Sequence, residues 1–186
     1  MKMTNLFNRK KGDITVHSLP ILQELVSITK NGSIDRAIQL LTATGKSNNL
    51  VSIPYTPEAS RTDFESVRQC MLSENLNDNE LAALLAVAMM KKHPKSVSQL
   101  LLENGYSQTS MERIIYLGTY TSTLQSLAEF TSSGIKRYKI SSCGDSKVCA
   151  KCKQHDGKKH LVNKAIIGKN APPFCERCRC IITAEF

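Results

Sequence analysis

Two pairs of cysteines near the end of this chain have the spacing of metal ligands. Cys149 and Cys152 are separated by two residues, and Cys175 and Cys178 repeat that spacing after 22 intervening residues. Each C-x-x-C unit lets a tight turn present two thiolates to one ion, and two such units complete a tetrahedron around zinc. Cys180 stands two residues after Cys178, on the same face if this segment is a strand. We therefore expect one structural zinc ion per chain, bound by Cys149, Cys152, Cys175 and either Cys178 or Cys180.

Other interpretations of these cysteines are buried free thiols, a redox pair or a disulfide framework. The chain holds seven cysteines, an odd number, and its first residues lack the apolar segment of a signal peptide, so disulfides are not expected. A catalytic zinc is not expected, because four thiolates leave no open position for water. The zinc deaminase pattern also fails, since His155 is followed by Asp-Gly where His-x-Glu is required, and Pro173-Phe-Cys175 has one residue too many. We therefore expect the chain not to be an enzyme.

Charge is spread unevenly along the chain, whose net charge is +9. Residues 133–186 hold twelve basic and four acidic side chains, whereas residues 13–132 hold nine basic and twelve acidic ones. Such asymmetry indicates a polyanion partner, although a solvated basic face is the plainer alternative. We expect any contact with DNA to be non-specific and salt-dependent. The candidate residues, of which the four lysines from Lys151 onward are favoured, are Lys136, Arg137, Lys139, Lys151, Lys153, Lys158 and Lys159.

The elements that must position these residues fall into a helical part and a β-rich part. Apolar residues at helical spacing predict helices over 19–30, after Ser33, from Thr62, from a cap at Asp78 to Lys92, from Pro94 to Gly105 and from Ser107 to Ser132, with a loop over 45–60. Beyond Gly134, alternating apolar and polar residues predict strands over 135–140 and 180–183. The fold class that we expect is α+β, a helical N-terminal body followed by a small β-rich zinc module.

The same patterns suggest three parts along the chain. We expect a flexible basic arm over 1–16, a helical domain over 17–132 and the zinc-binding module over 133–186. The longest apolar run, from Leu81 to Met90, is ten residues long, short of the roughly 20 that cross a bilayer. No membrane partner is therefore expected.

Four segments of the last third occur in a distinctive order. A helix leads to an aromatic strand segment ending at Ile140, which is followed by Gly144-Asp-Ser-Lys-Val-Cys-Ala-Lys-Cys152. Asp156-Gly-Lys158 comes next, and Pro172-Pro-Phe-Cys-Glu-Arg-Cys-Arg-Cys180 closes the series. This order resembles the phage head-morphogenesis family, the Mu F-like minor head proteins. The resemblance covers roughly residues 107–186.

The resemblance implies a role for each cysteine in turn. The first metal-type positions of the family match Cys149 and Cys152, and the final Cys-Arg-Cys matches Cys178 and Cys180. The family histidine before that pair matches Cys175, an exchange that preserves a zinc ligand. The chain departs from the family where Ile115-Tyr-Leu-Gly118 replaces an Arg-Thr-Glu motif.

The family resemblance implies a structural protein of a phage or prophage head, acting in capsid or portal assembly or in DNA packaging. Its partners would be portal and capsid proteins, with DNA as a possible ligand, and its place would be the virion or the host cytoplasm. The alternative from the residues alone is a zinc-ribbon nucleic-acid-binding regulatory protein, with the helical body used for dimerisation.

Overall fold

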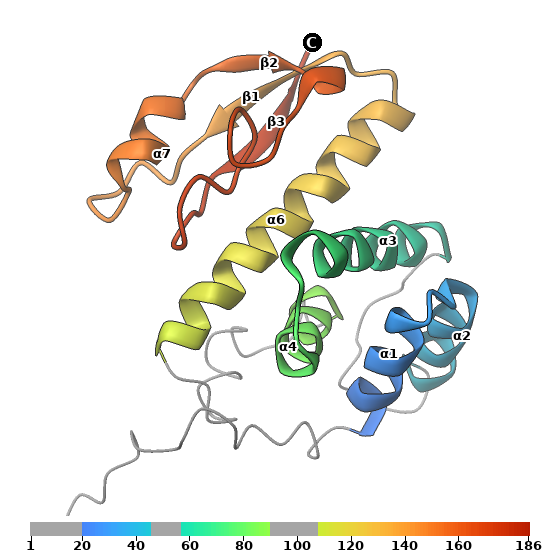
Figure 1. The fold of residues 1–186 in the computed structure, drawn as a ribbon. Coiled ribbons are helices and arrows are strands. Elements are labelled where there is room, and N and C mark those ends of the chain that lie inside the picture. Colours follow the sequence, from blue (N-terminus) through green and yellow to red (C-terminus); the bar gives the residue numbers. More distant parts are fainter. Residues whose placement is uncertain (1–19, 46–56, 90–107) are drawn as a thin grey trace, which may run out of the picture.

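The computed structural model describes residues 20–45, 57–89 and 108–186 of the chain, and these residues form an α+β structure (Figure 1). A set of helices precedes a small three-stranded antiparallel sheet, so the expected fold class is confirmed. The elements, in chain order, are α1 (Pro20–Lys30), α2 (Ile34–Gly45), α3 (Pro57–Glu74), α4 (Asp78–Met89), α6 (Gln108–Ser132), β1 (Arg137–Ser141), α7 (Ala150–His155), β2 (Lys159–Leu161), the short 3-10 helix η2 (Val162–Lys164) and β3 (Ile181–Glu185).

Two helices end where glycine follows them. Gly32 after α1 has a φ of 72°, and Gly134 after α6 has a φ of 70°. After α6, the Ile135 N–H donates to the Phe130 carbonyl over 2.8 Å, which closes the helix by the Schellman pattern. Glycine suits this position because it has no Cβ to clash at positive φ. The predicted ends of both helices are confirmed.

Two predicted helix starts are wrong. Helix α3 begins at Pro57, not at Thr62, so the last four residues of the predicted loop are helical. Proline favours a first helical position because its fixed φ suits the helix and its missing N–H needs no partner there. The cap of α4 is Asn77, one residue before the predicted Asp78: the Glu80 N–H donates to Asn77 Oδ1 over 2.9 Å, and the Asn77 N–H donates to Glu80 Oε2 over 3.2 Å.

The helical core is built from the inner faces of α1 to α4 and the first half of α6. Helix α4 contributes a run of buried residues from Leu81 to Leu85, and α6 contributes Ile114 and Leu117. On α3, Cys70 is fully buried, whereas Leu72 is 64% exposed. Cys70 follows buried Val67 by three residues, the spacing that keeps two side chains on one side of a helix.

The sheet has the order β2-β1-β3, with both pairings antiparallel. Tyr138 and Ile140 of β1 point inward and are fully buried, while Arg137 and Lys139 alternate with them on the other side. Strand β1 begins at Arg137 and not at the predicted Ile135, because the Ile135 N–H is used to close α6. The inward residues pack against the second half of α6, so this one helix contributes to both cores.

Several expectations fall on residues that the structure does not describe. The basic arm over 1–16 and the helix from Pro94 to Gly105 lie outside the described residues. The division of the chain at residue 132 stays a prediction. Among the described helices, none combines the length and the apolar character that a membrane span requires.

Candidate metal centre

The first cysteine pair is built around the start of α7. Cys149 precedes the helix in extended conformation, and its Sγ accepts a hydrogen bond from the Cys152 N–H over 3.4 Å. Cys149 therefore does for α7 what a serine or asparagine does at other helix starts, since it satisfies a free N–H of the first turn. One turn later, Cys152 faces inward and is 3% exposed. The C-x-x-C spacing thus places both sulfurs on the same side of the helix start.

The second pair lies in the loop that leads into β3. The Cys178 N–H donates to the Cys175 carbonyl over 3.0 Å, which folds the segment into a tight turn. The Cys178 carbonyl in turn accepts a hydrogen bond from the Thr119 hydroxyl of α6 over 2.7 Å. This turn is therefore held by its own backbone and by the long helix behind it.

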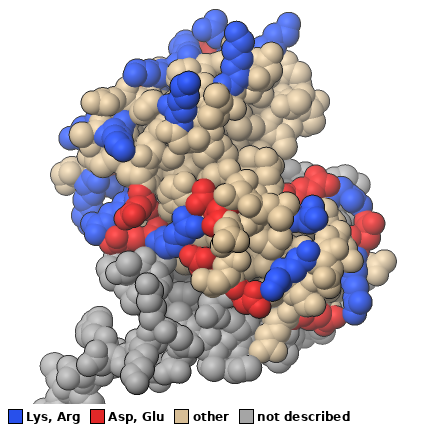
Figure 2. Space-filling view, in the orientation of Figure 1, with Lys and Arg blue, Asp and Glu red and all other residues tan. Residues whose placement is uncertain are grey.

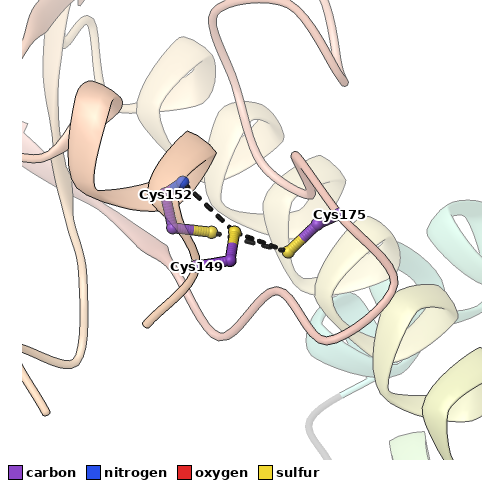
Figure 3. Close-up of side chains that lie close together, drawn as sticks. All are labelled: Cys149, Cys152 and Cys175. Carbon is purple, nitrogen blue, oxygen red and sulfur yellow. Dashed lines mark hydrogen bonds between the residues drawn. The ribbon is translucent and has the colours of Figure 1, made fainter. Parts of the chain in front are cut away.

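The two pairs converge on one cluster. Figure 3 shows Cys149 and Cys152 at the start of α7 with their sulfurs directed toward Cys175 on the facing loop. The sulfur of Cys175 lies 3.1 Å from that of Cys149 and 3.7 Å from that of Cys152, and the sulfurs of Cys152 and Cys178 lie 3.6 Å apart. Cys152 also belongs to a second group with Cys178 and Cys180, in which all sulfurs lie within 4.8 Å. These clustered cysteines could hold a metal ion.

The acidities of the thiols differ within the cluster. The N–H of Cys152 and the thiol of Cys175 lower the pKa of Cys149 to about 7. Burial raises the pKa values of Cys152 and Cys175, and it raises that of Cys180 to about 12. Buried thiols in such proximity resist ionising together, because each new thiolate adds a like charge. A bound metal cation would offset that charge and convert the thiols to thiolates.

An ion pair joins the segments that carry the two cysteine pairs. The two terminal guanidinium nitrogens of Arg179 donate to the Asp145 carboxylate, over 2.8 and 2.9 Å. Asp145 also accepts a hydrogen bond from the Lys147 N–H over 3.0 Å, which shapes the turn before Cys149. Hydrogen bonds from Arg179 lower the pKa of Asp145. The sequence did not predict this pair, although both residues lie within the motifs described above. Asp145 precedes the first cysteine pair, and Arg179 is the arginine of Cys-Arg-Cys.

The Asp-Gly-Lys motif connects the end of α7 to the sheet. Asp156 accepts a hydrogen bond from the Ser142 N–H over 2.7 Å, and the same contact lowers its pKa. The Gly157 N–H donates to the Ile140 carbonyl, and the Ile140 N–H donates to the Lys158 carbonyl, over 2.8 and 2.9 Å. The motif therefore forms a turn that fixes α7, and with it Cys152, against the end of β1.

The remaining cysteines and the two nearby histidines lie outside the metal-binding groups among the described residues. Cys143 is exposed and its thiol donates to the Arg179 carbonyl, while Cys70 lies in the helical core, where burial raises its pKa to about 11. The His155 ring stacks on Phe174 at 3.9 Å between ring centroids. His160 lies against Tyr138 on the inner side of the sheet.

The basic residues of the module do not form one patch. Figure 2 shows Lys and Arg spread over the part of the molecule that Figure 1 assigns to the sheet and α7, with the acidic side chains mainly on the helical part. Arg137, Lys139 and Lys159 share the outer side of the sheet, because each alternates with an inward residue. Lys151 and Lys153 instead lie on α7, two residues apart. The remaining two predicted residues, Lys136 and Lys158, precede β1 and β2 and are exposed.

No family model, curated protein or solved structure matches the chain. The comparisons therefore do not identify a family for the chain.

Proposed function

We propose that the cluster binds one zinc ion, as a structural site, through Cys149, Cys152, Cys175 and Cys178. Zinc binds thiolates at about 2.3 Å in a tetrahedron, which places neighbouring sulfurs about 3.8 Å apart. The two distances from Cys152, 3.7 Å to Cys175 and 3.6 Å to Cys178, lie close to that value. Four thiolates would fill the coordination shell and leave the ion no position for a substrate.

Cys178 and Cys180 are the two candidates for the fourth zinc ligand. Cys178 is fully buried and belongs to the tight turn that begins at Cys175, as the second thiolate of a C-x-x-C unit does. Cys178 and Cys180 both belong to the second group with Cys152, but Cys180 lies beyond that turn, next to β3. We therefore assign Cys178 to the zinc and leave Cys180 as a buried neighbouring thiol.

Metal analysis of the protein purified without chelator tests the zinc site. We expect about one equivalent of zinc per chain, and less than half an equivalent would contradict the proposal. Cys178→Ser and Cys180→Ser then form a matched pair. With cobalt in place of zinc, we expect the charge-transfer absorption of a four-thiolate site to survive in Cys180→Ser and to weaken in Cys178→Ser. The reverse result would assign Cys180 as the ligand.

We further propose that the chain is a minor head protein of a phage or prophage, with a structural role in head assembly. One observation supports the family likeness beyond the order of the motifs: Asp145 of the first motif binds Arg179 of the last. The Asp-Gly-Lys motif between them holds α7 to the sheet. Residues that join in one built site have a physical reason to occur together, whereas a chance arrangement of short motifs has none.

Co-sedimentation tests this role. The protein is expressed with the portal and major capsid proteins of the phage or prophage genome that encodes it, and heads are separated on a gradient after nuclease treatment. We expect the chain to travel with the heads or with the portal. A chain that stays at the top of the gradient, although heads form, contradicts the proposal.

A zinc-ribbon regulatory protein is the second candidate, and the uneven charge of the module favours it. Residues 133–186 carry a net charge of 12 − 4 = +8, as a nucleic-acid-binding module would. The two candidates differ in base preference, because phosphate contacts carry no sequence information. Selection from a random DNA pool is the discriminating experiment. Enrichment of one sequence would favour the regulator, and its absence the head protein.

A further inference from the structure

The outer side of the three-stranded sheet carries an unusual pairing of like charges. Lys139 on the central strand lies directly opposite Lys159 on β2, and Arg137 lies two residues along on the same side. Like charges directly opposite each other destabilise an antiparallel pair. The ion pair between Glu185 and Lys159 offsets part of this cost, and a bound anion would offset more of it.

Acidic groups near these cations reduce their charge without cancelling it. Glu185 of β3 pairs with Lys159, and its pKa is lowered by Lys159, Lys139 and Arg137. Asp156 is the other carboxylate in range, and it is already bound by the Ser142 N–H. Arg137, Lys139 and Lys159, together with Glu185, which lies opposite Arg137, carry a net charge of 3 − 1 = +2.

The apolar side chains on this side do not form a groove. Leu161 lies opposite Arg137 at one corner of the sheet, and Ile181 lies opposite Ser141 at the diagonally opposite corner. Both are exposed, but the cations lie between them. A partner that needs apolar pockets, such as an amphipathic helix, finds no continuous strip here.

We propose that this face, formed by Arg137, Lys139 and Lys159, binds the phosphate backbone of double-stranded DNA. The inference deepens the proposed head-protein function by naming a partner and its contact surface. Residues two apart on a strand lie about 6.6 Å from each other, and neighbouring strands are about 4.8 Å apart, so three cations gather within a small area. The DNA backbone supplies charge at matching density, one phosphate per about 3.4 Å of each strand.

The two lysines of α7 are less suited to bind the DNA backbone. Lys151 and Lys153 are two residues apart, and helical residues at that spacing do not face each other. They cannot both reach the same stretch of backbone, so the geometry favours the sheet over the lysines beside the cysteines. The two pairs nevertheless have the same residue type and the same charge, which makes one the matched control of the other.

The experiment compares Lys139→Gln/Lys159→Gln with Lys151→Gln/Lys153→Gln in the full-length protein. Binding to a labelled mixed-sequence duplex of about 30 base pairs is measured between about 50 and 200 mM salt. We expect the sheet variant to lose about tenfold in affinity at the low-salt end and to reduce the salt slope by about 1.8, or 0.9 for each phosphate contact removed. The α7 variant should lose less than a third as much.

A folding defect is excluded by measuring the zinc content and the thermal midpoint of each variant, which should match those of the parent. Equal losses in the two double variants, or no DNA binding by the parent at low salt, would overturn the proposal. Tighter binding to poly-glutamate than to DNA would also overturn it, in favour of an acidic protein partner. If DNA binding fails while the chain still sediments with nuclease-treated heads, only this surface is refuted and the head-protein function stands.

Discussion

The helical core and the cysteine module differ in what fills them. The helical core is closed by aliphatic side chains from five helices, among them the fully buried Leu25, Leu84 and Leu117. The module core has eight buried members, of which four are large apolar or aromatic residues and three are the cysteines 152, 178 and 180. Burial of aliphatic side chains is favourable by itself, whereas clustered cysteines would gain folding free energy from a bound metal ion. We therefore expect the helical region to be stable without a ligand, and the module to depend on the proposed zinc ion.

Loss of the metal is the largest perturbation that this difference predicts. Cys152→Ser removes the sulfur that both groups share, and we expect it to abolish zinc binding and to unfold β1, β2 and β3. Structural zinc contributes on the order of 10 kcal/mol to small domains. Amide hydrogen exchange should lose protection across the sheet and in the last turns of α6, while α1 to α4 stay protected.

Exposed Cys143, which lies outside both groups, supplies the control. Cys143→Ser should keep its zinc and its exchange pattern. Protection of the sheet that survives zinc removal would show that the module core suffices alone, and the contrast between the regions would fail.

The opposite experiment removes an aliphatic side chain from the helical core. Leu84 is 1% exposed, and Leu84→Ala should lower the free energy of unfolding of the helices by about 2–5 kcal/mol through lost burial and a cavity. Urea unfolding followed by far-ultraviolet circular dichroism measures the loss. Zinc content should stay constant at urea concentrations lower than those that unfold the helices. Release of zinc at the urea concentration where the helices unfold, in parent and variant alike, would show one cooperative unit.

The ion pair of the module gives a smaller effect. Asp145→Ala removes the carboxylate that ties the turn before Cys149 to Arg179, and we expect zinc affinity to fall about tenfold, the lower end for outer-shell partners because the pair is partly exposed. Competition with a chelator of known affinity measures this. Asp35→Ala breaks an exposed aspartate–arginine pair between helices and should leave zinc affinity unchanged. Similar losses in both variants would assign the effect to net charge.

How much could be predicted from the sequence also differs between the two regions. Helix ends marked by Gly32 and Gly134 were predictable because one local motif decides them. The start of α3 was not, because Thr62-Asp-Phe-Glu65 and Pro57 each satisfy a helix-start rule, and the helix begins at the earlier of the two. Local patterns compete in this way wherever two rules apply to neighbouring residues.

In the module, the spacing of the cysteines indicated a metal site, yet the supports of that site were invisible. Asp145 and Arg179 are 34 residues apart, and Thr119 is 59 residues from Cys178. No periodicity connects such positions, since only the folded chain brings them together. The face shared by Arg137, Lys139 and Lys159 likewise depends on a register that alternation within one strand does not reveal.

The smallest expected effect concerns the bond between the two regions. The Thr119 hydroxyl donates to the Cys178 carbonyl over 2.7 Å, so the long helix contacts the backbone of a proposed ligand. Thr119→Val keeps the shape but leaves that carbonyl without its partner, which should cost about 1 kcal/mol. If the hydrogen bond orients the Cys175–Cys178 turn, this cost should lower zinc affinity roughly fivefold and should change the stability of the helices little.

Thr131→Val on the same helix is the control. It removes a hydroxyl that donates within α6, to the Leu127 carbonyl, and should leave zinc affinity unchanged. A Thr119 variant that binds zinc as tightly as the parent would mean that the backbone hydrogen bond of the turn is enough to hold it. Helix α6 would then contribute packing contacts to the metal centre, but not the orientation of its ligands.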